Sequence, residues 1–246
     1  MSAADAARIP VVHAVTTRAI LGRPDFLTTA RSVMRALGPR GALHLRAEHA
    51  ADASTATRPL SARMLYALAA ALAPDQAATG AWLVVNERVD IALAAGARAV
   101  QLPGRGLGVA DAAAAARATH RSLRVGVSIH TSDEAPLATD AAWVVVGHLL
   151  PTPSHPGEPP RGAPLVRAVA AASPVPIVGI GGVRPEHVAA LRAAGVTGVA
   201  VIRGIWSASD AAQAAARYLS AYDAGDDATA CAAGDRGRIG GPHGQR

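Results

Sequence analysis

PIVGIGGVRPEHVAALRAAGVTGVAVIRG, residues 176–204, contains two short apolar runs, 176–182 and 198–204, on either side of a segment with helical spacing. Each run is rich in valine and isoleucine and is bounded by glycine, which is typical of a buried strand. Pro185-Glu186 marks the start of a helix, because proline is favoured in a first helical turn. The stretch therefore predicts a strand, a helix and a second strand parallel to the first.

The same alternation runs through the whole chain. Six further apolar runs are VVHAV (11–15), ALHLR (42–46), WLVVN (82–86), AVQLP (99–103), RVGVSIH (124–130) and AAWVVVG (141–147). Helix-entry signals between the runs are Pro24-Asp25, Ser61, Asp111, Ser132, and Ser207 or Ser209 before Asp210. Eight strands, each followed by a helix, predict an α/β fold, the (β/α)8 TIM barrel. A doubly wound sheet would need a glycine-rich turn after its first strand, and VVHAVTTRA (11–19) has none.

The expected domain boundaries follow from composition. Residues 1–10 form an N-terminal extension, residues 11–222 form the barrel, and the small, polar, glycine-rich residues 223–246 form a flexible, disordered tail. The single cysteine, Cys231, falls in that tail, so neither a disulfide framework nor a thiol nucleophile is expected in the barrel. The chain start lacks the apolar region of a signal peptide, and no run approaches the roughly 18 apolar residues of a membrane span. A cytoplasmic protein with no membrane partner is expected.

The charge balance is basic, with a formal net charge of +6, and every basic residue is an arginine. The arginines are spread along the sequence, and only 3% of the residues are aromatic, too few to stack nucleic-acid bases. A solvated arginine surface explains the charge, so no nucleic-acid partner is expected. The arginines favour a small anionic substrate.

The expected strands end in residues suited to a site. These are Thr16-Thr17, Arg46, Asn86-Glu87, Gln101, Ser128 and His130, Gly147-His148, Gly181-Gly182, and Arg203-Gly204. In (β/α)8 barrels the loops after strands seven and eight commonly bind a phosphate through backbone N–H groups. The residues expected to bind it are Gly181, Gly182, Ile202, Arg203 and Gly204. A tight turn is the alternative explanation for the two adjacent glycines.

His148 is the candidate catalytic residue. It follows a valine-rich strand, and prolines at 151, 153 and 156 exclude a helix directly after it. A buried histidine with a structural role is the alternative, but the position at a strand end favours a site, where an imidazole can take and return a proton. Ser128 and His130 are expected to support the residues that touch the ligand. No pair of histidines has a metal-ligand spacing backed by carboxylates, so no metal is expected.

Between about residues 11 and 222 the chain resembles the thiamin phosphate synthase and TenI superfamily. The motifs that carry the resemblance are HLR (44–46), WLVVNERVDIALAAGARAVQLP (82–103), VGVSIH (125–130), VVVGHLLPT (144–152), PIVGIGG (176–182) and GVAVIRGI (198–205). In the synthase branch, the resemblance implies a magnesium-dependent joining of a thiazole phosphate to a pyrimidine pyrophosphate. That branch has acidic residues after strands three and four, Gly-Pro after strand six, and a lysine. Here Asn86-Glu87 and Gly147-His148 stand at matching positions, and there is no lysine.

The Gly-His pair and Val-Gln-Leu-Pro after strand four instead match the TenI-like branch. That resemblance implies a thiazole tautomerase, an isomerase without cofactor, in which His148 moves the proton on a small phosphorylated thiazole substrate. It also implies that Arg46 pairs with the substrate carboxylate, and that Asn86, Gly147 and Leu149 contact the substrate. Arg46 could instead tie down its loop, and Asn86 could cap the next helix. The synthase reaction and a non-catalytic regulator that binds a thiamin-pathway phosphate remain the alternatives, and a homo-oligomer is expected by analogy.

Overall fold

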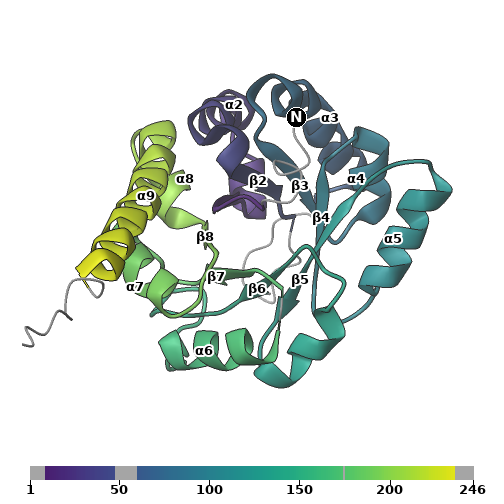
Figure 1. Ribbon diagram of the computed structural model, residues 1–246. Helices are drawn as coiled ribbons and strands as arrows, with labels where there is room; N and C mark the ends of the chain where they lie inside the picture. The colour runs from purple at the N-terminus through teal and green to yellow at the C-terminus, as the bar shows by residue number, and fades with distance from the viewer. Residues whose placement is uncertain (1–8, 48–59, 174, 236–246) are drawn as a thin grey trace, which may run out of the picture.

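Eight parallel strands close into a barrel with helices on its outside (Figure 1), in a computed structural model that describes residues 9–47, 60–173 and 175–235. The strands are β1 (Val12–Val15), β2 (Gly41–Leu45), β3 (Trp82–Asn86), β4 (Ala99–Leu102), β5 (Arg124–Ile129), β6 (Trp143–Val146), β7 (Ile177–Ile180) and β8 (Gly198–Val201). Each strand pairs with the next, and Val12 of β1 is aligned both with Gly41 of β2 and with Val199 of β8. The predicted (β/α)8 barrel is confirmed.

Helices follow the strands as the sequence predicts. The α-helices are α1 (Arg18–Leu21), α2 (Phe26–Leu37), α3 (Ala62–Thr79), α4 (Val89–Ala95), α5 (Val109–Ala118), α6 (Gly162–Ala172), α7 (Val188–Ala193), α8 (Arg203–Trp206) and α9 (Ala211–Asp235). Short 3₁₀ helices are η1 (Gly38–Arg40), η2 (Ser132–Ala138) and η3 (Pro185–His187). Ser61 caps α3, because its side chain accepts a hydrogen bond of 3.2 Å from the Met64 N–H.

Two connections differ from the prediction. The segment after β5 forms the 3₁₀ helix η2 rather than an α-helix, because it is only seven residues long and contains Pro136, which has no N–H to donate. The last helix does not follow β8 directly, because the four-residue helix α8 lies between them. Asp210, which directly precedes α9, caps it, since its carboxylate accepts a hydrogen bond of 2.9 Å from the Gln213 N–H.

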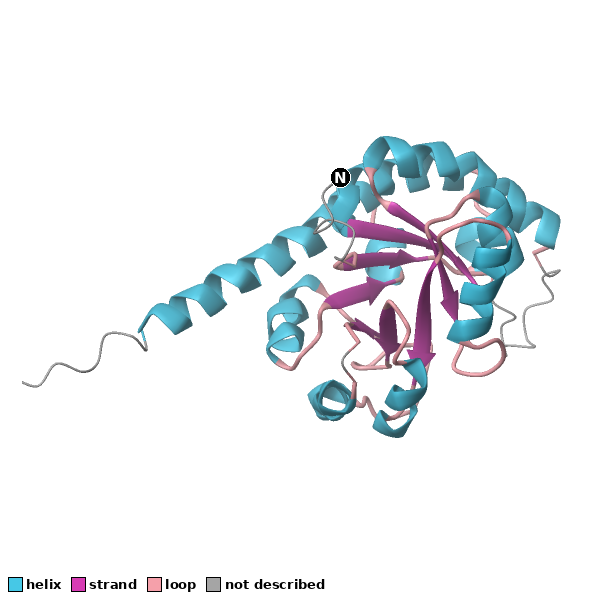
Figure 2. Ribbon diagram, turned by 45° about the vertical axis from the view of Figure 1, so that its right-hand side comes forward, coloured by secondary structure: helices cyan, strands magenta, loops and turns pink. Residues whose placement is uncertain are grey.

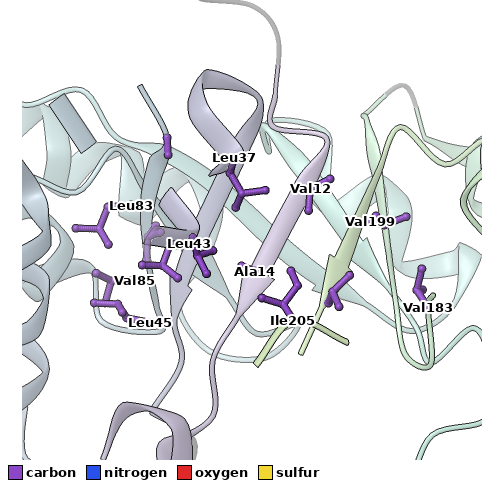
Figure 3. Close-up of a cluster of buried hydrophobic side chains, with 14 of the residues drawn as sticks. Val12, Ala14, Leu37, Leu43, Leu45, Leu83, Val85, Val183, Val199 and Ile205 are labelled. Carbon is purple, nitrogen blue, oxygen red and sulfur yellow. The ribbon is translucent and has the colours of Figure 1, made fainter. Parts of the chain in front are cut away.

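The main core lies between the strands and the helices, and Figure 3 shows part of it around β1, β2 and β3. Alternate strand residues point outward into this layer, for example Leu43 and Leu45 of β2, both fully buried. The residues between them point into the barrel. That interior is filled by Trp82 and Trp143 with smaller aliphatic side chains, so the barrel is a packed core and contains no pore.

The last helix extends past the expected end of the barrel. Its first half packs against α2 and α7, and it then continues to Asp235, away from the barrel (Figure 2). The first part of the segment 223–246, which we expected to be flexible, is thus helical, because its many alanines favour a helix. Residues 236–246, and residues 1–8 of the N-terminal extension, lie outside the described residues. Within the described ranges, no helix combines the length and hydrophobicity needed to cross a bilayer.

Candidate active site at the carboxyl ends of the strands

Nearly all the predicted site residues meet at one end of the barrel, because the carboxyl ends of parallel strands lie at the same edge. Arg46 follows β2, Asn86 ends β3, Ser128 and His130 are at the end of β5, Gly147 and His148 follow β6, Gly181 and Gly182 follow β7, and Ile202, Arg203 and Gly204 follow β8. We call this end of the barrel the mouth. Residues 48–59, which follow β2, lie outside the described residues.

Leu149 is the exception. Its side chain is fully buried in the core between strands and helices. Its N–H donates to the Ile180 carbonyl at 2.9 Å, and its own carbonyl accepts from the Gly162 N–H at 3.0 Å. With the side chain and both backbone groups engaged, Leu149 has nothing to offer a ligand, and it is a packing residue.

The glycine pair after β7 has a structural role beside its expected ligand role. Gly181 and Gly182 have φ values of 98° and 69°, which disfavour other residues. A Cβ on Gly181 would lie 2.5 Å from the Cβ of His148, and one on Gly182 would lie 2.5 Å from the Pro151 carbonyl oxygen. The glycines therefore let the loop after β6 pack closely against the loop after β7. In the described part of the chain, their N–H groups donate to no backbone carbonyl outside the strand ladder.

Arg203 is exposed at the rim of the mouth, and its guanidinium donates a hydrogen bond of 3.1 Å to the Thr152 hydroxyl. It thereby joins the end of β8 to the loop after β6. Gly204, the next residue, lies against α9. A Cβ there would lie 2.1 Å from the Tyr218 hydroxyl of α9, so Gly204 is required by the packing of α8 against α9. A contact between Gly204 and a phosphate, which the sequence predicts, would be made by the backbone N–H.

His148 is 6% exposed, and its Nε2 atom is buried with no hydrogen-bond partner among the described residues. The ring of His155 stacks on it, with 4.4 Å between centroids and 13° between planes. Glu158 is next to His155, with 3.6 Å between its Oε1 atom and His155 Nδ1. One ligand atom from each of these three residues lies within 4.8 Å of the other two. Sequence reasoning missed His155 and Glu158 as neighbours of His148, although three such donors within eleven residues around a strand end were a usable signal.

The loop that carries His155 is anchored at both ends. At its start, the Leu150 N–H donates to the Gly181 carbonyl at 3.0 Å. At its end, the Arg161 N–H donates to the His148 carbonyl at 3.2 Å, and the Arg161 guanidinium donates to the His130 carbonyl. Within the loop the His155 N–H donates to the Thr152 carbonyl at 3.0 Å. These bonds fold the proline-rich segment back over His148.

Arg46 lies half-buried at the mouth, where burial lowers the pKa of its guanidinium and the negative charge of Glu87 opposes that effect. Glu87 follows β3 with a φ of 67°, and its N–H donates to the Gln101 carbonyl at 2.8 Å. The Arg46 N–H donates to the buried Thr16 hydroxyl at 3.0 Å, and that hydroxyl donates to the His44 carbonyl at 2.9 Å. The backbone at Arg46 is therefore fixed to the ends of β1 and β2.

A chain of polar side chains runs through the barrel interior, and sequence reasoning missed it. His13 of β1 contacts the Pro10 carbonyl oxygen through Nε2 at 2.9 Å and His44 of β2 through Nδ1 at 2.8 Å. His44 Nδ1 in turn lies 3.2 Å from the side-chain amide of Asn86. Burial lowers the pKa of His13 to about 4, and it lowers the pKa of His44 as well. Both imidazoles are therefore neutral near pH 7.

Neutral imidazoles fix the direction of every bond in this chain. His13 Nε2 faces a carbonyl oxygen, so it carries the proton, and its Nδ1 atom accepts from His44 Nε2–H. His44 Nδ1 then has no proton and needs a donor. The nearer amide atom of Asn86 is Oδ1, an acceptor, so the neutral network requires the amide turned by 180°, which exchanges O and N almost without change of shape. Asn86 then donates to His44, and its oxygen is left to accept at the mouth.

A second interior chain links Trp143 to the mouth. The Trp143 indole N–H donates to Gln101 Oε1 at 2.8 Å, and Gln101 Nε2 donates to the Ser128 hydroxyl at 3.2 Å. The expected supporting role of Ser128 thus has a geometric basis. His130 differs, because its side chain is exposed and its N–H donates to Glu134 Oε2 at 2.6 Å.

A surface cavity of about 460 Å³ lies at the opposite end of the barrel from these residues. It is lined by Trp82 and by four arginines, Arg98, Arg117, Arg121 and Arg124, on α5 and on the loops that precede β4 and β5. The Arg98 guanidinium lies 4.8 Å from the centre of a Trp82 ring. No predicted site residue lines this cavity, and barrel enzymes have their active sites at the other end, so we place the site at the mouth.

Comparison with known proteins points to one family. A family model described as thiamine monophosphate synthase matches residues 12–205. A thiamine-phosphate synthase of Roseiflexus castenholzii is 34% identical over 212 residues, which are 85% of this chain and 86% of that protein. The thiamine biosynthesis bifunctional protein ThiM/ThiE of Symbiobacterium thermophilum is 44% identical over 144 residues, but the match spans 57% of this chain and only 29% of that protein.

Among solved structures, a thiamine phosphate pyrophosphorylase from Pyrococcus furiosus has a TM-score of 0.70 and covers 87% of this chain and 96% of its own. At 22% sequence identity this likeness supports the fold. The native KDPGal structure, with a TM-score of 0.63 and 18% identity, covers 89% of this chain and supports the same barrel.

These relatives correct the predicted activity. The chain was expected to be an isomerase, a thiazole tautomerase, and that prediction was wrong, because the similar proteins are named thiamine-phosphate synthases, which are transferases. The error came from giving Gly147-His148 and the Gln101-Leu102-Pro103 stretch more weight than the rest of the chain. The proton-transfer role assigned to His148 belonged to the tautomerase and falls with it.

Proposed function

Because this chain belongs to the thiamine monophosphate synthase family, we propose that it joins a thiazole phosphate to a pyrimidine pyrophosphate. The observation that carries the proposal is the similarity to a synthase of nearly equal extent, along 85% of the chain. In the proposed reaction the thiazole ring nitrogen bonds to the methylene carbon of the pyrimidine. The carbon–oxygen bond to pyrophosphate breaks, and its electron pair leaves with pyrophosphate.

The residues at the mouth supply the charge that two phosphorylated substrates need. The backbone at Gly181 and Gly182 and the guanidinium of Arg203 are the proposed phosphate site, since free N–H groups and a cation are the usual ligands of a phosphate. Arg46 is the second proposed contact, for the other anionic group. Arginine takes both parts because the chain contains no lysine, and its fork of donors suits phosphate oxygens.

The interior network gives Asn86 a defined part in the proposal. In the amide orientation that the neutral network requires, the Asn86 NH₂ group donates to His44 Nδ1, which leaves the amide oxygen to accept a hydrogen bond from a substrate amine or ring N–H. Gly147 allows the end of β6 to pack closely against Ile180 of β7, because a Cβ at Gly147 would lie 2.5 Å from the Ile180 side chain. We therefore assign Gly147 a packing role rather than a contact with substrate.

The family implies a magnesium ion, and the residues at the matching positions do not fit one. Magnesium prefers several carboxylate or water oxygens in octahedral geometry. Glu87 is the one carboxylate directly after β3, and the loop after β4 has none before Asp111, whose carboxylate accepts from the Gly108 N–H at the start of α5 at 3.3 Å. No step of the proposed reaction is therefore routed through magnesium at these positions.

Those departures favour a second candidate, a protein that binds the phosphorylated substrates without joining them. One assay separates the two. Purified protein is incubated with thiazole phosphate, pyrimidine pyrophosphate and Mg²⁺, and thiamine phosphate is measured after oxidation to its fluorescent derivative. Product above the level without enzyme supports coupling, and substrate binding without product, even at stoichiometric enzyme, supports the second candidate.

Matched variants test whether the product forms at the mouth. Arg46→Gln removes a half-buried cation beside Glu87 and is expected to lower kcat/KM at least about tenfold, because a hydrogen bond to a charged group contributes about 1.5–3 kcal/mol. Arg117→Gln, which removes an exposed arginine of α5 at the other end of the barrel, is the control and is expected to leave it unchanged. Equal activity in the two variants would contradict the placement of the site.

A further inference from the structure

Three metal-ligating side chains meet over the mouth, at positions where the resemblance assigns no metal. They are His148, directly after β6, and His155 and Glu158, in the proline-rich loop that folds back over it. One ligand atom from each lies within 4.8 Å of the other two, and His155 Nδ1 is 3.6 Å from Glu158 Oε1. In the described part of the chain this is the one such group of three.

The buried member of the group, His148, has a ring nitrogen without a hydrogen-bond partner among the described residues. His148 is 6% exposed, and its Nε2 atom is buried without a hydrogen-bond partner among the described residues. Leaving a buried polar atom unpaired costs free energy, so such atoms are normally satisfied by a protein group, a water or an ion. The atom lies under the ring of His155, which is exposed to solvent on its other side. A ligand shared by both imidazoles would satisfy it.

The donor set selects the class of ion. Two imidazole nitrogens and one carboxylate oxygen suit zinc and related divalent transition metals, whereas magnesium and calcium prefer oxygen ligands. Three protein ligands leave a fourth position of a tetrahedral ion open for water or for an oxygen of a bound ligand. The site would lie close to the proposed phosphate contact, because Thr152, in the same loop as His155, accepts a hydrogen bond of 3.1 Å from the Arg203 guanidinium.

We propose that His148, His155 and Glu158 bind a divalent transition metal ion, with zinc as the natural occupant, at the mouth of the barrel. Zinc ligands at about 2.0–2.2 Å from the ion lie roughly 3.3–3.5 Å from one another, so pairs of these atoms need to approach by up to about 1.4 Å. The His155 ring must also turn out of the stacked arrangement, because a metal lies in the plane of each ring that binds it.

The loop permits that adjustment. His155 and Glu158 have about half of their side chains exposed, so both can rotate without disturbing the core. The backbone stays in place, because hydrogen bonds to the β7 loop and the His148 carbonyl hold the two ends of the loop. Five prolines between residues 151 and 160 restrict the backbone further. The site thus combines a fixed buried ligand with two adjustable ones.

The test uses cobalt as a visible substitute for zinc. Tag-free protein, stripped of metal, is titrated with Co²⁺, and zinc affinity is then measured by competition with a fluorescent chelator. One equivalent of metal is expected, with the intense visible absorption of four-coordinate cobalt. His155→Ala and Glu158→Gln should each weaken zinc binding at least about tenfold, since loss of a partner outside the ligand shell alone typically costs about 10–100-fold.

His120→Asn is the matched control. It removes an exposed histidine at a φ of 54°, which asparagine tolerates, and it should leave zinc binding unchanged. Thermal melts of the metal-free variants establish that each is folded. Weak binding without intense absorption, or equal zinc affinity in His155→Ala and His120→Asn, would overturn the proposal. No substrate is present in these measurements, so their result is independent of whether the protein joins the two substrates.

Discussion

Among single residues, His13 has the clearest energetic signature. Its imidazole is fully buried and its pKa falls from 6.5 to about 4, mainly through burial. The unfolded chain takes up a proton on this residue below about pH 6.5, whereas the folded protein does so only near pH 4. The stability associated with the neutral imidazole is therefore complete above pH 6.5 and is lost as the pH falls toward 4.

We expect this one residue to remove about 3 kcal/mol of the free energy of unfolding across that interval. Urea denaturation at pH 7, 6, 5 and 4 measures the change. The variant His13→Gln should be less stable at pH 7 but should have a shallower pH dependence than the wild type, whereas His120→Asn should retain the wild-type slope. An unchanged slope in His13→Gln would mean that His13 takes up its proton over the same pH range in the folded and the unfolded protein.

Arg203 allows a test of the proposed phosphate site that the glycines do not. Replacing Gly182 would push a side chain against Pro151 and move the whole loop, so lost binding would have two explanations. Arg203→Gln should weaken the binding of thiazole phosphate about tenfold or more, since a charge-assisted hydrogen bond contributes about 1.5–3 kcal/mol. The control is Arg217→Gln on α9, whose guanidinium contacts Gln213. Calorimetry giving equal affinities for both variants would place the phosphate elsewhere.

Among the elements, the contact between α8 and α9 depends on a single glycine. The Tyr218 hydroxyl donates to the Val183 carbonyl at 3.0 Å, and burial raises the pKa of that hydroxyl to about 12. Gly204 leaves the space that the hydroxyl needs, because a Cβ there would be 2.1 Å from it. Gly204→Ala is expected to lower the free energy of unfolding by about 1–3 kcal/mol through overpacking.

Tyr218→Phe tests whether crowding of the Tyr218 hydroxyl causes the loss of stability expected in Gly204→Ala. Alone it should cost about 1 kcal/mol, the typical value of a lost hydrogen bond. Combined with Gly204→Ala it should cost less than the sum of the two, because the atom that crowds the new methyl group is gone. Urea denaturation of the four proteins completes the cycle. Strict additivity would show that Gly204 matters for its backbone conformation and not for the space beside it.

The sequence predicted the strands and the main helices better than the short segments that connect them. Short valine-rich runs identified the eight strands, because burial on both faces leaves no other pattern for a parallel barrel strand. The 3₁₀ helix η2 and the added helix α8 were missed, since both are short and depend on how the neighbouring loops pack. The end of α9 was placed near residue 222, because glycine and polar residues were given more weight than the alanines that continue the helix to Asp235.

The same limit applies to the site. Position at a strand end was enough to place Arg46, Asn86 and His148 at one mouth. The contact between His13 and His44, 31 residues apart, exists only because β1 and β2 are neighbours with both side chains turned inward. The contact between His155 and His148 was missed, since it depends on how the loop folds back over the end of β6. Leu149 was expected to touch the ligand, but its apolar side chain is fully buried in the core between the strands and the helices.

The barrel as a whole is closed around an interior filled by side chains. Trp82 and Trp143 belong to the buried cluster that fills it, and the interior polar groups that the structure describes bond largely to one another. A family resemblance over the full barrel fixes this architecture, while the chemistry depends on the few loop residues at one end. That separation explains why the fold was predicted correctly and the reaction was not.

Because the interior is filled by side chains, ligands can enter and leave the proposed site only at the mouth. Both substrates of the proposed coupling, and both products, would therefore have to pass through the mouth. The side chains that fill the interior, Trp82 and Trp143 among them, would close any second route along the barrel axis.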